Sequence, residues 1–168
     1  PVILALCAIA SAGAWEDPDL PHYDLGVDLG VAALRHSGGN HELSPQVGLW
    51  LRKGSGSWFG ELDLDLATGA EPVPGGKMRN SLIRPMLLFG WRGGTRPMHL
   101  GLALGLAGTT YVATSPTGSA VAITPGVCAR MDLHVPLGDH MLLVGSTSGT
   151  QRGRSGDFDL SLGWGWRW

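Results

Sequence analysis

The chain closes with Phe158-Asp159-Leu160-Ser161-Leu162-Gly163-Trp164-Gly165-Trp166-Arg167-Trp168, in which every second residue is large and apolar. Strict alternation is the period of a β-strand whose two faces meet different surroundings. Small and charged residues lie between the apolar ones, and three tryptophans end the run. An apolar outer row, a polar inner row and terminal aromatic residues are typical of a strand in a transmembrane β-barrel. The closing stretch therefore predicts an all-β protein of the outer membrane.

The composition supports one membrane domain and excludes some partners. A chain of 168 residues is long enough for one domain. Its net charge of −2 gives no reason to expect a nucleic-acid partner. Charged residues make up 15 % of the chain, which is less than the roughly one quarter found in soluble domains. No motif calls for a cofactor or a metal.

The first fourteen residues predict a secretory signal peptide with a truncated start, followed by the barrel domain at 15–168. Val2–Ala10 is apolar, and Ala12-Gly13-Ala14 fits a cleavage site. An apolar strand or a short anchor helix is the alternative, although nine residues are too few to cross a bilayer as a helix. Lipidation at Cys7 is disfavoured by the bulky Leu6. The mature chain would then keep one thiol, Cys128, as a small core residue.

Seven more alternating segments precede the closing one, which predicts eight strands, the smallest size of this barrel class. Apolar residues alternate with small or polar residues along each of them, and the alternation is weakest in the seventh. The segments are Tyr23–Val31, Val47–Leu51, Leu62–Leu66, Leu87–Trp91, Met98–Leu106, Val127–Val135 and Met141–Gly145.

The connections between these segments alternate in predicted length. Short turns are expected at Lys53–Ser57, Gly93–Arg96 and Pro136–Asp139, and longer loops at Arg35–His41, Thr68–Asn80, Gly108–Ser119 and Ser148–Ser155. Outer-membrane barrels have short periplasmic turns and longer outer loops. The pattern therefore predicts that both termini are periplasmic.

Two further patterns refine this picture. Tryptophans gather at the end with the short turns, where an aromatic girdle at the membrane interface is expected; ordinary core packing is the alternative. Prolines recur every 40 residues, and each is expected to start a strand or to form a bulge near the outer rim. The predicted girdle is Trp58, Trp91, Trp164, Trp166 and Trp168, and the prolines are Pro45, Pro85 and Pro125.

On these features residues from about 20 to 168 resemble the small eight-stranded outer-membrane barrels of the OmpA/OmpX type. The resemblance implies an up-and-down antiparallel barrel, a monomer surrounded by outer-membrane lipid. It also implies that the barrel-assembly machinery reads the C-terminal strand, whose last residue is most often Phe in that family and is Trp168 here. The resemblance is architectural and brings no catalytic motif.

The inward face is predicted to carry charges of both signs. Because an eight-stranded barrel is just wide enough for its side chains, and buried charges must be paired, we expect a salt-bridged plug rather than an open pore. The expected charge network is Asp28, Glu61, Asp63, Asp65, Arg84, Arg130, Asp132, His134, Asp159 and Arg167. Other residues expected to face inward are Asp24, Gln46, Trp50, Arg52, Arg92 and His99.

Three inward or loop motifs have a chemical alternative. The Glu61, Asp63 and Asp65 carboxylates could hold a cation, but successive inward residues lie roughly 7 Å apart, so Arg partners are expected. The pair Asp132 and His134 could serve a general base, with Ser161 or a loop serine as nucleophile. His36 and His41 flank one loop, which is too few ligands for a metal site.

The sequence thus predicts a non-enzymatic outer-membrane barrel of a Gram-negative envelope with a structural or surface-interaction role. A narrow, porin-like channel that passes small or hydrophobic molecules is one alternative. A lipid-modifying enzyme is another, and it requires a Ser hydroxyl beside His134 or His99. If the apolar rows faced inward instead, the chain would be a soluble, lipocalin-like barrel.

Overall fold

The structure is a computed structural model and describes residues 21–35, 41–73, 75–94, 98–153 and 155–168. The predicted signal peptide, the cysteine within it and His36 lie outside these residues. None of the described residues forms a helix long and apolar enough to cross a membrane.

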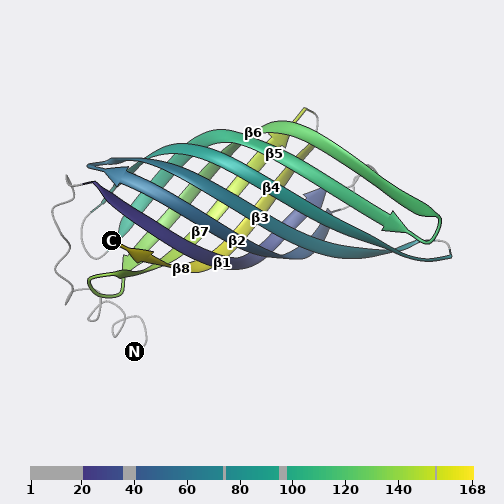
Figure 1. The fold of residues 1–168 in the computed structure, drawn as a ribbon, viewed down its shortest axis with the longest axis horizontal. Coiled ribbons are helices and arrows are strands. Elements are labelled where there is room, and N and C mark those ends of the chain that lie inside the picture. The colour runs from purple at the N-terminus through teal and green to yellow at the C-terminus, as the bar shows by residue number, and fades with distance from the viewer. Residues whose placement is uncertain (1–20, 36–40, 74, 95–97, 154) are drawn as a thin grey trace.

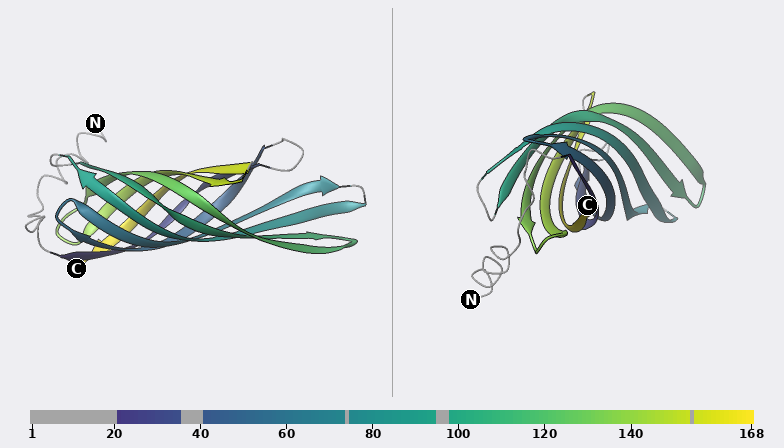
Figure 2. Two further views of the ribbon diagram at one scale, coloured as in Figure 1. Left: turned by 90° about the horizontal axis from the view of Figure 1, so that it is seen from above. Right: turned by 60° about the vertical axis from the view of Figure 1, so that its left-hand side comes forward.

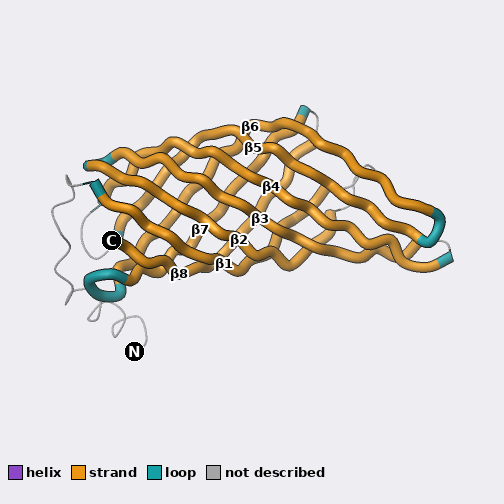
Figure 3. The backbone as a smooth tube through the Cα atoms, viewed as in Figure 1, coloured by secondary structure: helices purple, strands orange, loops and turns teal. Residues whose placement is uncertain are grey.

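Eight antiparallel strands form a closed barrel in which each strand pairs with its neighbours in sequence and β8 returns to β1 (Figures 1 and 3). This confirms the predicted fold class, and each predicted segment lies in one strand except for the end residues Met98 and Trp168. The strands are β1 (His22–Arg35), β2 (His41–Ser55), β3 (Trp58–Val73), β4 (Gly76–Gly93), β5 (His99–Ser115), β6 (Gly118–Pro136), β7 (Met141–Arg152) and β8 (Ser155–Arg167).

The alternation of side chains separates an apolar outside from a polar inside. Leu104 is 70 % exposed, whereas Asp132 is 1 % exposed and points into the lumen. Leu64, Leu102, Leu133 and Leu160 are exposed, while Asp65, Ala103 and Asp159 are buried. This arrangement is the reverse of a soluble barrel that binds an apolar ligand, so the lipocalin-like alternative is wrong.

The barrel closes between its first and last strands. The pairing runs from Asp24 with Arg167 to Ala33 with Phe158. Backbone hydrogen bonds of 3.0 Å join the amide of Tyr23 to the carbonyl of Trp168 and the amide of Trp168 to the carbonyl of Tyr23. The terminal residue therefore takes part in closing the barrel.

Three of the predicted long loops are instead β-strand. Residues 68–73 and 76–80 belong to β3 and β4, residues 108–115 and 118–119 to β5 and β6, and residues 148–152 to β7. The turns left between them are short, such as Pro116 and Thr117 between β5 and β6. Their Gly, Ser and Thr content resembles that of loops, but hairpin partners supply the ladder hydrogen bonds that keep each chain extended.

The two ends of the barrel differ in strand length rather than in loop length. The β2–β3 pairing stops at Gln46 with Ala67, and the β6–β7 pairing stops at Val127 with Gln151. Beyond these points β3–β6 continue as one sheet, while β1 and β2 continue as a separate, shorter hairpin to Arg35 and His41 (Figures 1 and 2). We call this part the sheet extension; it comprises Thr68–Val73, Gly76–Ser81, Thr109–Ser115 and Gly118–Gly126.

The three repeated prolines lie within strands, and the pairing register is the same on both sides of each, so the prediction of a strand start or a bulge is wrong. Each faces outward, and Pro45 pairs with Val31 and Pro125 with Gly108. The ladder between β4 and β5 skips Arg84 and Pro85. Proline lacks the backbone N–H that a ladder bond needs and is tolerated at sheet edges. Pro45 and Pro125 lie where their strands have a neighbour on one side only, so the missing donor can face the open edge.

Candidate functional site

Three arginines cross the lumen and organise its interior. Arg52 on β2, Arg84 on β4 and Arg130 on β6 are at most 5 % exposed. Because a buried guanidinium without a partner is costly, the partners of these three side chains define what the lumen can do. We call them and their partners the lumen network: Arg52, Arg84, Arg130, Asp28, Glu61, Asp63, Asp65, Asp132, His134 and Asp159.

Every carboxylate of the acidic triple on β3 pairs with an arginine, and Glu61 pairs with two, since its Oε1 also lies 3.0 Å from Arg130 Nη1. Arg52 Nε donates to Glu61 Oε2 at 2.5 Å, and Arg84 Nε donates to Asp65 Oδ2 at 3.2 Å. Arg130 Nη1 donates to Asp63 Oδ2. The guanidinium groups thus take the positions that a bound cation would need. The described residues contain no group of three or more His, Cys, Asp or Glu side chains able to hold a metal ion.

The same arginines reach a second wall of the barrel. Arg52 Nη2 and Arg130 Nε donate to the two oxygens of Asp132 on β6, each at 2.7 Å. Arg84 Nη2 donates to Asp159 on β8. Since each guanidinium presents several donors in a fixed plane, it can join β3 to another strand. The network therefore braces the barrel from inside.

A column of hydroxyl groups on β7 completes the network. Thr150 Oγ1 accepts from Arg84 at 3.2 Å, and Ser146 Oγ accepts from Arg130 at 3.1 Å. Ser148 Oγ donates to Asp159 Oδ2 at 2.7 Å. The sequence interpretation missed this column because it ended the strand near Gly145 and assigned Ser148 to a loop. The signal present is alternation of Ser or Thr with Gly, which has little contrast in hydrophobicity.

Arg167 lies apart from the other predicted network residues. Its guanidinium binds Asp24 through two hydrogen bonds of 2.5 and 2.7 Å at the junction of β8 with β1. Arg92 Nη2 lies 2.8 Å from His22 Nε2 at the same end. The lumen thus holds the network in its middle and a second charged group near the chain terminus.

Trp50 fills part of the lumen between glycines. A Cβ placed on Gly26 would lie 2.2 Å from Trp50 Cζ2, and one on Gly165 would lie 2.5 Å from Trp50 Cη2. The Arg52 guanidinium carbon lies 5.4 Å from the Trp50 ring centroid and 4.3 Å from that of Phe59. Large rings and small residues therefore share the narrow interior, as expected for eight strands.

His134 does not have the partners of a catalytic base. Its Nε2 lies 2.6 Å from Arg52 Nη1 and 3.7 Å from Asp132 Oδ2. Among the described residues these are its polar contacts, and no hydroxyl group is among them. Ser161 Oγ lies 2.8 Å from Ser146 Oγ, and His99 is half-buried opposite His134. The geometry gives no support to a Ser–His pair at His134.

Carboxylates outnumber guanidiniums within the network. Three arginines face six carboxylates, namely Asp28, Glu61, Asp63, Asp65, Asp132 and Asp159. The Oδ1 atoms of Asp28 and Asp63 are buried without a hydrogen-bond partner in the described structure. Removing an arginine should therefore disturb the network more than removing a carboxylate.

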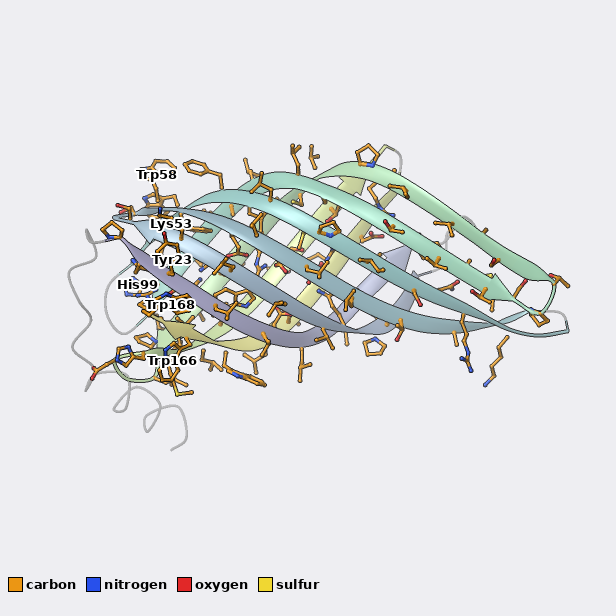
Figure 4. All side chains as sticks on the ribbon, in the orientation of Figure 1. Tyr23, Lys53, Trp58, His99, Trp166 and Trp168 are labelled. Atoms are coloured by element: carbon orange, nitrogen blue, oxygen red, sulfur yellow. The ribbon has the colours of Figure 1, made fainter. Side chains whose placement is uncertain are left out.

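Exposed aromatic side chains ring the end that carries the C-terminus. The five predicted tryptophans are 42–57 % exposed. Trp168 stacks on Tyr23 at 6.2 Å between centroids, and Lys53 Nζ lies 5.3 Å from the Tyr23 centroid. Figure 4 shows Tyr23, Lys53, Trp58, Trp166 and Trp168 at this end. Aromatic rings beside a cation suit a membrane–water interface.

Comparisons with known proteins identify the fold. No protein-family model matches the chain, and neither does any curated protein. Solved structures do match, at identities too low to show more than a shared fold. Neisserial surface protein A has a TM-score of 0.65 at 10 % identity, covering 87 % of this chain and 96 % of that one. OprG of Pseudomonas aeruginosa has a TM-score of 0.64 at 14 % identity, with 88 % and 95 % coverage.

A third match is Ail, the attachment invasion locus protein of Yersinia pestis, solved in complex with the heparin analogue sucrose octasulfate. It has a TM-score of 0.64 at 12 % identity, covering 88 % of this chain and 97 % of Ail. The chain therefore has the fold of the small eight-stranded outer-membrane barrels.

Proposed function

We propose that this protein is a non-conducting, non-enzymatic outer-membrane barrel that presents the sheet extension for surface interaction. The observation that carries the proposal is the contrast between a lumen crossed by three buried arginines and a four-stranded sheet, β3–β6, that continues past the closed part of the barrel. Ion pairs cross the described part of the lumen, whereas the extension offers accessible strands.

The outward surface supports a place in the bilayer. Leu62, Leu87 and Leu106 form one row across β3, β4 and β5, and each is 58–64 % exposed. Burying such surface in lipid rather than water is favourable by about 25 cal/mol per Å². A monomer in outer-membrane lipid, inserted by the barrel-assembly machinery through β8, accounts for this surface.

The edge of the sheet extension suits interaction with another polypeptide. Residues Gly118–Gly126 of β6 pair with β5 but not with β7. Val121 and Ile123 on this edge are 64 % and 75 % exposed, and residues 108–126 contain no charged residue. Edge strands with free backbone groups are templates for an added strand.

Orientation in the membrane can be tested by thiol labelling of intact Gram-negative cells. In a Cys128→Ala background, Thr117→Cys places a thiol at the tip of the β5–β6 hairpin and Ser57→Cys places one in the β2–β3 turn. With both termini periplasmic, a membrane-impermeant maleimide should label Thr117→Cys in intact cells and Ser57→Cys only after permeabilisation. The opposite pattern would show that the barrel is inverted.

The non-conducting lumen is tested in a planar lipid bilayer. We expect no stepwise conductance from the purified wild-type protein, under conditions in which a porin control gives clear steps. Discrete steps from the wild type would favour the channel alternative, because they require a continuous aqueous path past Arg52, Arg84 and Arg130.

A further inference from the structure

The sheet extension carries an isolated pair of cations on its outward face. Lys77 and Arg79 on β4 are exposed and share the parity of Ile83 and Leu87, which face outward from the barrel. Neither cation has a hydrogen bond or ion pair with any side chain that the structure describes. Two like charges on the same face of one strand repel each other, so an anionic partner from outside the chain is favoured at this place.

Among the side chains that the structure describes, the outward surface of the strands bears cations but no carboxylates. The outward-facing charges there are Lys53, Lys77 and Arg79, while the described strand carboxylates face the lumen. Lys53 lies against the Tyr23 ring at the end with the tryptophans. The described charges on the outer face where β4 leaves the barrel, Lys77 and Arg79, are therefore both positive.

Pairing register arranges the residues beneath the cations in layers. Leu66, Ile83 and Thr110 form one outward row across β3, β4 and β5. Thr68, Ser81 and Val112 form the next, and Ala70, Arg79 and Thr114 the third. Along β4 itself the outward side chains change from Ile83 through Ser81 to Arg79, and this order from apolar to hydroxyl to cation is that of a membrane leaflet from acyl chains through the ester region to the phosphates.

The height of the pair above the aromatic end also fits a bilayer. Trp91 and Arg79 are twelve residues apart on β4, which is about 31 Å along the barrel axis at a rise of about 3.4 Å per residue and a tilt of about 40°. A bilayer core is about 30 Å thick and about 40–45 Å with its headgroups. With Trp91 at one interface, Arg79 reaches the headgroup layer of the other leaflet.

We propose that Lys77 and Arg79 bind the phosphate groups of anionic lipid headgroups in the leaflet from which the sheet extension projects. The inference rests on the proposed placement in the membrane. Thr114, opposite Arg79 in the register and exposed, supplies a hydroxyl group on the same face. The bound lipid would hold the barrel at one depth in the membrane and would stabilise the part of the sheet extension next to the bilayer.

Native mass spectrometry of the folded protein in detergent micelles tests this proposal. Short-chain phosphatidylglycerol, phosphatidylcholine and inorganic phosphate are titrated separately onto the wild type, Lys77→Gln/Arg79→Gln and the control Lys53→Gln. Each cation near an anionic surface contributes about fivefold in affinity. The wild type and Lys53→Gln should therefore prefer phosphatidylglycerol over phosphatidylcholine by about 5- to 30-fold, and the double variant should lose that preference.

A preference that survives in Lys77→Gln/Arg79→Gln, or that disappears in Lys53→Gln instead, would overturn the assignment. Inorganic phosphate that binds as well as the lipid would identify a free anion, not a headgroup, as the ligand. Because the substituted side chains of both variants are exposed, both proteins should fold, and heat-modifiable migration on a gel checks this. Thiol labelling in cells tests the membrane placement separately, so failure of one proposal can be told from failure of the other.

Discussion

Replacing Arg84 by methionine should be one of the most damaging single changes in the lumen. Arg84 is fully buried and is the cation that binds both Asp65 and Asp159. It also donates to Thr150 Oγ1 at 3.2 Å. Methionine retains an apolar stem but leaves two buried carboxylates without their cation.

The expected cost follows from the loss of one partner in a buried ion pair. Breaking such a pair destabilises a protein by about 3–5 kcal/mol, because the remaining charge is uncompensated. Ser148 still donates to Asp159 at 2.7 Å, which keeps the cost within that range rather than doubling it. Since carboxylates exceed guanidiniums in the network, Asp28→Asn should cost less than about 1 kcal/mol by the same argument.

Urea unfolding in detergent micelles, followed by tryptophan fluorescence, measures both changes as free energies of unfolding. Lys77→Met serves as a surface control, because Lys77 is exposed and should change stability by no more than about 0.5 kcal/mol. The triple variant Arg84→Met/Asp65→Leu/Asp159→Leu removes all three charges and should regain most of the loss. If Arg84→Met costs less than Asp28→Asn, the account of the network as a charge-limited brace is refuted.

Two other changes probe packing and closure. Gly26→Ala should destabilise the barrel by about 1–3 kcal/mol, because its Cβ would lie 2.2 Å from Trp50. Gly60→Ala is the control, because a Cβ at Gly60 meets nothing within 4 Å. Equal unfolding midpoints for the two variants would contradict the packing argument. Arg167→Met removes the two hydrogen bonds to Asp24 where β8 meets β1. The fraction of protein that migrates as a folded barrel on unheated gels should therefore fall. An unchanged fraction would show that the backbone pairing closes the barrel without this ion pair.

Alternation was enough to predict which face each charged side chain would occupy. Arg130, Asp132 and His134 on β6 alternate with Met131 and Leu133, and the structure places the first set inside and the second outside. This parity is local, since successive side chains of any strand point to opposite faces. It therefore needs no knowledge of the partner strands.

Which charges meet could not be predicted, because that depends on the shear of the closed barrel. Arg130 on β6 and Asp63 on β3 are 67 residues apart in sequence and form an ion pair across the lumen. No local pattern encodes their relative height. Sign and parity alone predict that Arg167 belongs to the network, whereas its height in the barrel places it beside Asp24.

The sequence could not predict the sheet extension, for a different reason. Gly, Ser and Thr in residues 108–119 have the composition of a loop, but strand formation is decided by pairing and neighbours as much as by propensity. Ladder bonds to β6 extend as far as Ser115 with Gly118. A sequence window cannot show that a hairpin partner continues beside it.

The lumen network and the sheet extension involve the same strands, which gives the buried charges a role beyond filling space. The acidic triple lies on β3, Arg84 on β4, and Arg130 with Asp132 on β6, and these strands continue into the extension. Arg52 ties Glu61 of β3 to Asp132 of β6. The ion pairs thus hold together the strands from which the β3–β4 and β5–β6 hairpins project. Arg84→Met should therefore raise the rate of amide hydrogen exchange in residues 109–126 more than in the β2–β3 turn. Uniform exchange across both regions would mean that the extension holds its shape independently of the lumen.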